Sequence, residues 1–137
     1  MLRRTDSNNP HDWLFFAASD MEGIQTLAAK QMSYWMCQSK LAEALEKILK
    51  AELIRLGWLL EKTHDLQRLG GELQARGSDL AATVRPLCNA LAEVYFSHRY
   101  PGFDLEEENW PELDGWVAQI AVLLTTVQGR LPPVVSE

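Results

Sequence analysis

The residues best suited to chemistry in this sequence end a long helical pattern, in the stretch SHRYPGFD at residues 97–104. Arg99 carries a guanidinium, which pairs with phosphate oxygens in a two-pronged geometry, and Tyr100 offers a ring on which a base can stack. Pro101 and Gly102 turn the chain directly afterwards. A structural interpretation is equally open, because a cation suits the negative end of a helix and a tyrosine can pack as a wedge between helices.

Three further polar side chains could join Arg99 and Tyr100. Lys47 and Lys50 lie about one turn apart on a predicted helix, and His64 follows that helix in a short polar loop. Cations that converge on a groove would hold the phosphates of a nucleotide, and an imidazole can move a proton near neutral pH. The alternatives are a solvated helical face for the lysines, and capping or packing for the histidine. The ligand-binding residues that we predict are Lys47, Lys50, His64, Arg99 and Tyr100.

Other kinds of site lack their usual patterns. The chain has no glycine-rich phosphate loop, no Ser-His-Asp arrangement and no acidic Mg²⁺ motif. Cys37 and Cys88 stand alone, and with three scattered histidines they lack the ligand spacing of a zinc site. We therefore expect two buried free thiols, no metal and no cofactor.

The elements that must position these residues are helices, because helical periodicity recurs and strand alternation is hard to find. Asn9 followed by Pro10 predicts the start of the first helix. Gly57 predicts the end of a second helix that begins near Ser33. The core face predicted for the first helix comprises Trp13, Phe16, Ala17, Asp20, Ile24, Leu27 and Ala28.

The second half of the chain continues the pattern. Thr63 can cap a short helix that Gly70 and Gly71 weaken, and a longer helix begins near residue 78 or at Pro86. The last helix runs from about residue 111 to Gly129. The fold class that we predict is all-α, an up-and-down antiparallel four-helix bundle with an additional short helix between helices two and three. Residues 1–137 are expected to form a single domain.

The distribution of charge and an excess of apolar residues indicate what the chain can bind. The formal net charge is −6, and residues 104–114 hold acids without any Lys or Arg, either as a solvated loop or as a surface for a basic partner. This balance disfavours non-specific binding to nucleic acid. No apolar run can span a membrane and no signal peptide is visible, so a cytoplasmic location is expected. The apolar run that includes Trp13, Phe15 and Phe16 exceeds one core face and predicts a homodimer.

Three motifs in order resemble the HEPN family, named for higher-eukaryote and prokaryote nucleotide-binding domains. They are EKILKAELIRLG at residues 46–57, THDL at 63–66 and RYPG at 99–102. The resemblance extends from about Trp13 to Val127 and implies a helical nucleotide-binding module. Ala42 and Glu43 stand where the family often has glutamines, so the ligand contacts of those glutamines do not carry over.

The wider family includes metal-independent ribonucleases, whose sites resemble an Arg followed four to six residues later by a His. After Arg99 those positions are Asp104, Leu105 and Glu106, so no imidazole is present. We therefore expect no catalytic residue and a binding module that takes a nucleotide or serves as partner of a minimal nucleotidyltransferase. By resemblance the pair would form a two-component system of the toxin–antitoxin kind. The alternatives are a metal-independent endoribonuclease whose motif departs from the family pattern, and a purely protein-binding dimeric adaptor.

Overall fold

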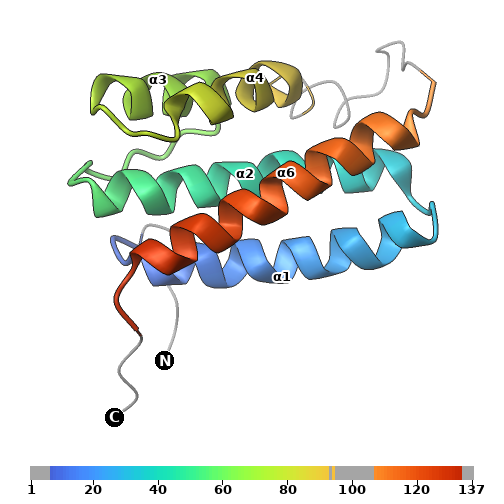
Figure 1. Cartoon of the computed structure of the whole chain (residues 1–137), viewed down its shortest axis with the longest axis horizontal. Coiled ribbons are helices and arrows are strands. Elements are labelled where there is room, and N and C mark those ends of the chain that lie inside the picture. Colours follow the sequence, from blue (N-terminus) through green and yellow to red (C-terminus); the bar gives the residue numbers. More distant parts are fainter. Residues whose placement is uncertain (1–6, 93, 95–106, 134–137) are drawn as a thin grey trace.

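The structure, a computed structural model, describes residues 7–92, 94 and 107–133 of the chain. This part holds no strand and five helices (Figure 1): α1 (Pro10–Ala29), α2 (Tyr34–Arg55), α3 (Leu66–Ala75), α4 (Ala81–Leu91) and α6 (Trp110–Arg130). The predicted all-α class is confirmed. Among these helices none has a stretch that is long and apolar enough to cross a bilayer.

An asparagine cap with a proline in the first turn begins both α1 and α6. The Asn9 side chain accepts a hydrogen bond of 3.0 Å from a backbone N–H of the first turn, and Asn109 accepts one of 3.1 Å. Each proline stands where its missing N–H leaves no helical hydrogen bond unmade. The predicted starts of the first and last helices are confirmed. The predicted end of the last helix is confirmed to within one residue, because α6 ends at Arg130, between Gly129 and the two prolines that follow.

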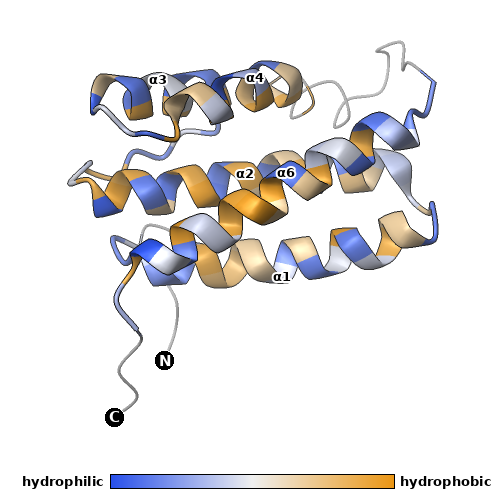
Figure 2. Cartoon of the chain, viewed as in Figure 1, coloured by the Kyte–Doolittle hydropathy of each residue, from blue (hydrophilic) through white to orange (hydrophobic). Residues whose placement is uncertain are grey.

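The central helix of the fold is α2. It packs against α1, α3 and α6, while α1 also contacts α6 and α3 contacts α4. Figure 1 shows the short pair α3 and α4 on one side of α2 and the long helix α1 on the other. Apolar residues are concentrated on α2 and along the middle of α6 (Figure 2). The core face of α2 buries Leu41, Leu45, Ile48, Leu49 and Leu53.

The buried face of α1 differs from the predicted one. Phe16, expected in the core, is 43% exposed, whereas Leu14 is buried. The run at residues 13–16 is apolar on every side, so periodicity alone could not select its inward-facing member. The side chains that α1 buries are Leu14, Ala17, Met21, Ile24 and Ala28.

The ends of α2 are held by residues with positive φ angles. Gly57, at φ +92°, follows the last turn, which confirms the predicted stop. In the turn between α1 and α2, Gln31 and Ser33 have φ angles of 51° and 56°. A left-handed conformation costs a residue with a side chain about 1 kcal/mol, so this turn is strained at two positions.

The cap of α3 is Asp65 rather than the predicted Thr63. The Asp65 carboxylate accepts a hydrogen bond of 3.1 Å from the backbone N–H of Arg68. Asp65 precedes the first helical residue directly, so its side chain reaches the third N–H of the helix. Thr63 stands two residues earlier and accepts a bond of 3.2 Å from the N–H of Asp65.

The glycine pair, predicted to weaken the short helix, lies inside α3 without interrupting it. A Cβ atom on Gly70 would lie 3.2 Å from Cys88 Sγ and 3.1 Å from Arg85 Cδ. Gly70 therefore allows α3 and α4 to approach each other closely. Pro86 lies inside α4, which begins earlier, at Ala81. Residues 93 and 95–106 lie outside the described part, so the full up-and-down bundle stays a prediction.

Candidate functional site

Glu46 is the centre of a small ionic cluster where α2 meets the loop that leads to α3. Its Oε2 is 3.0 Å from Lys50 Nζ, and its Oε1 is 2.9 Å from His64 Nδ1. Glu46 and Lys50 are buried, whereas the His64 side chain is 58% exposed. The structure thus brings two of the predicted ligand residues, Lys50 and His64, to one carboxylate.

Lys50 is held from a second side by α1. Its Nζ lies 5.0 Å from the centroid of the Trp13 ring, where the ring quadrupole attracts a cation by about 1–2 kcal/mol once water is removed. The Trp13 indole N–H donates a hydrogen bond of 2.8 Å to the carbonyl oxygen of Ser7. The solvated-face alternative is therefore wrong for Lys50, because α1 packs over this part of α2 and buries the ammonium.

Lys47, the next predicted ligand residue, is directed to another partner. Its ammonium forms a short, part-buried ion pair with the Asp20 carboxylate of α1. This pair joins α1 to α2, and it offsets the charge that a phosphate would need. The role of Lys47 as a ligand contact stays a prediction.

The remaining predicted site residues, Arg99 and Tyr100, lie outside the described residues, as does the window at 104–106 that lacks a histidine. The described part therefore places two of the five predicted residues together and a third on a separate ion pair. Within the same part, no three His, Cys, Asp or Glu side chains are grouped so that they could hold a metal ion.

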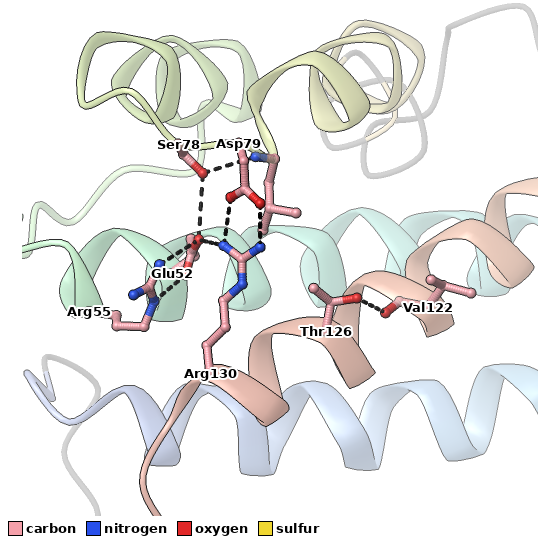
Figure 3. Close-up of polar contacts among 8 residues, drawn as sticks. Glu52, Arg55, Ser78, Asp79, Val122, Thr126 and Arg130 are labelled. Carbon is pink, nitrogen blue, oxygen red and sulfur yellow. Dashed lines mark hydrogen bonds and ion pairs between the residues drawn. The ribbon is translucent and has the colours of Figure 1, made fainter.

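A second ionic cluster surrounds Glu52 (Figure 3), and sequence reasoning missed it. Glu52 is fully buried, and its carboxylate accepts hydrogen bonds from Arg55 at 2.6 and 3.1 Å. Arg130, at the end of α6, donates from Nη1 at 2.6 Å to the same carboxylate. Figure 3 shows the Arg130 guanidinium between Glu52 and Asp79, to which it also donates two bonds of 2.8 and 2.7 Å.

The charges of this cluster satisfy one another. The hydrogen bond from Arg130 lowers the pKa of Asp79, and the bond to Glu52 raises the pKa of Arg55. Arg130 joins the end of α6 to α2 and to the turn before α4, so the cluster fastens three parts of the fold. The spacing of Glu52 and Arg55 is a visible helical signal. Arg130 is 78 positions from Glu52, and nothing local points to it.

Two buried thiols and a buried amide lie outside both clusters. Cys37 and Cys88 are free and buried, as predicted, and burial raises the pKa of the Cys88 thiol to about 11. Gln38 is buried on α2, and its Oε1 has no hydrogen-bond partner in the structure as described. An unsatisfied buried oxygen is uncommon and reduces stability.

The helical fold and the ionic cluster around Glu46 together indicate the class of protein. The described part is an all-helical domain with a buried Glu–Lys pair on its central helix and a histidine from the following loop on the same carboxylate. The family profile described as HEPN domain matches residues 10–120. The chain belongs to the HEPN family, whose members are nucleotide-binding or ribonuclease-type modules. Neither the comparison with curated proteins nor the comparison with solved structures finds a match.

Proposed function

We propose that this chain is a non-catalytic HEPN binding module with a nucleotide as its ligand. The observation that carries the proposal is the convergence of Lys50 and His64 on Glu46 at the junction of α2 with the next loop. The proposal assigns no bond-breaking step, because residues 104–106 offer no imidazole partner for Arg99. Histidine is the side chain that most often transfers such a proton near neutral pH.

The residues of this site take different roles. His64 is exposed, and the Glu46 carboxylate fixes its ring through Nδ1, so His64 is the group that meets the ligand. Lys50 is buried with its charge offset by Glu46, so it positions that carboxylate and does not contact phosphate. Arg99 supplies the guanidinium for phosphate, and Tyr100 supplies the ring for a base.

Calorimetric titration with ATP and GTP tests this function. We expect wild type to bind, and His64→Ala and Arg99→Ala each to weaken binding by about tenfold, because each removes one charged or polar ligand contact. Lys62→Ala is the matched control, since Lys62 is an exposed cation in the same loop. Absence of heat from wild type at millimolar nucleotide would contradict nucleotide binding as the function.

A minimal nucleotidyltransferase is the partner that we propose for the module. The support is the family resemblance, and residues 1–137 themselves hold no nucleotidyltransferase motif. Co-expression with a nucleotidyltransferase encoded by a neighbouring gene should give one complex on a sizing column. Separate elution of the two proteins would contradict the pairing.

Self-association is proposed through α1. Phe15 and Phe16 are 58% and 43% exposed and pack edge to face, with ring centroids 5.4 Å apart. Trp13, predicted to join them, instead packs against the core and Lys50. Light scattering should show a dimer that Phe15→Ser with Phe16→Ser dissociates, because apolar burial drives such contacts. Val122→Ser, at another exposed apolar residue, should remain dimeric.

A further inference from the structure

The turn between α1 and α2 and the start of α6 lie at the same end of the molecule (Figure 1). This end carries exposed methionines and an aromatic cluster. Met32 in the turn and Met36 in the first turn of α2 are 51% and 56% exposed. The Tyr34 ring lies 4.7 Å from the Trp35 ring and 5.1 Å from the Trp110 ring, both edge to face. The contact between Tyr34 and Trp110 joins the start of α2 to the start of α6.

Acidic side chains border this aromatic cluster. Glu108 Oε1 accepts a hydrogen bond of 3.1 Å from the Trp110 indole N–H, which places its carboxylate beside the rings. Glu107, Glu112 and Asp114 are exposed in the same segment. Residues 107–116 contain no Lys or Arg. The surface therefore combines apolar contact area with an excess of negative charge.

We propose that this surface, the acidic end surface of Met32, Met36, Trp35, Trp110, Glu107 and Glu108, binds a basic amphipathic segment of a partner protein. Methionine side chains are flexible and polarizable, and they adapt to apolar anchors of different shapes. The carboxylates of the segment that begins α6 attract Lys and Arg on the same partner segment and raise its rate of association. An amphipathic helix with lysines beside leucines supplies both features.

The negative charge of the acidic end surface disfavours a second copy of the chain and nucleic acid as its occupants. A second copy of this chain would bring the same acidic patch to a two-fold contact, and like charges would then oppose each other. Nucleic acid would bring phosphates toward carboxylates, which is also unfavourable. Two lysines lie nearest in sequence to the turn between α1 and α2: Lys40 of α2 is already paired with Glu43 at 3.6 Å, and the exposed Lys30 at the end of α1 is a single cation against the four acids at residues 107, 108, 112 and 114. A cationic polypeptide is the occupant that this surface favours.

The strained turn supports a binding role for Met32. Gln31 and Ser33, which flank it, both have positive φ angles without being glycines. Such strain recurs at functional positions, where it holds a side chain in a required place. Here it presents an apolar side chain to solvent between two helices.

A labelled peptide of leucine and lysine tests the proposal with the full chain. Fluorescence anisotropy measures its binding to wild type, to Met36→Ser and to the double variant Glu107→Lys with Glu108→Lys. Val122→Ser and Glu22→Lys are matched controls, because Val122 and Glu22 are exposed residues outside the acidic end surface. A peptide of leucine and glutamate and a single-stranded RNA are the comparison ligands.

We expect the leucine–lysine peptide to bind wild type, and each change at the acidic end surface to weaken it by about tenfold. Both controls should bind as wild type does, and neither comparison ligand should bind. No binding to wild type would overturn the proposal, as would equal binding of the leucine–glutamate peptide or equal weakening in Glu22→Lys. Nucleotide titrations of the same variants should match wild type, so this result and that for the His64 site are distinguishable.

Discussion

Replacing Arg130 with methionine tests how strongly the Glu52 cluster holds the fold. The change removes one of two guanidiniums from a fully buried carboxylate and leaves an apolar stem. Removing the partner of a buried charge costs about 3–5 kcal/mol when nothing else pairs with it. Arg55 still bonds Glu52 at 2.6 and 3.1 Å after the change. We therefore expect a smaller loss, about 2 kcal/mol in the free energy of unfolding, or roughly 8 °C in Tm.

The matched control is Arg68→Met. Arg68 and Glu61 are 2.6 Å apart, the same separation as Arg130 and Glu52, but their side chains are 55% and 42% exposed. Exposed pairs contribute about 0–1 kcal/mol. Urea unfolding followed by circular dichroism measures both variants, and equal m values validate the comparison. If Arg130→Met costs no more than Arg68→Met, the reasoning that burial and not distance sets the strength is refuted.

Three further predictions concern single side chains. Gln38→Leu should raise the free energy of unfolding by about 1 kcal/mol, because the buried Oε1 makes no hydrogen bond in the described structure; a lower urea midpoint would contradict this. Stability should fall from pH 9.0, the usual pKa of a thiol, to about 11, where folded Cys88 ionises, because only the unfolded chain loses that proton in between; a Cys88→Ala curve as steep as wild type would contradict this. RNA incubated with wild type should remain intact, and cleavage that Arg99→Ala abolishes would identify a ribonuclease.

The sequence predicted those parts of the fold that local chemistry determines. Asn9 caps α1, a proline lies in the first turn of α6, and Gly57 ends α2, each as expected, because the signal and the structure lie within a few residues of each other. The cap of α3 was misassigned because two neighbouring residues carry the same local signal. Thr63 and Asp65 can both cap a helix, and only the final register of α3 selects the aspartate.

Contacts between residues that are far apart in the chain could not be predicted from local sequence patterns. Lys50 resembles any exposed lysine in the local pattern, and only the packing of Trp13 from α1 buries it. Arg130 was assigned no role, although it fastens α6 to both α2 and the turn before α4. The Glu46 site was predicted in part, since His64 and Lys50 were both named. The Glu46 carboxylate, which joins them, was noted only as part of the motif at residues 46–57.

The two ionic clusters differ in the property that decides whether a cluster can bind a ligand. In the described structure the Glu52 carboxylate is bonded to Arg55 and Arg130 and has no exposed surface, so a solute could reach it only if the helices separated. Around Glu46 the buried pair with Lys50 is equally closed, but the third member, His64, stands on a loop and is mostly exposed. A ligand can therefore reach His64 without breaking the Glu46–Lys50 pair. Binding at this corner should then change the exposure of His64 while leaving unfolding cooperativity intact, whereas disturbing Glu52 should change stability alone.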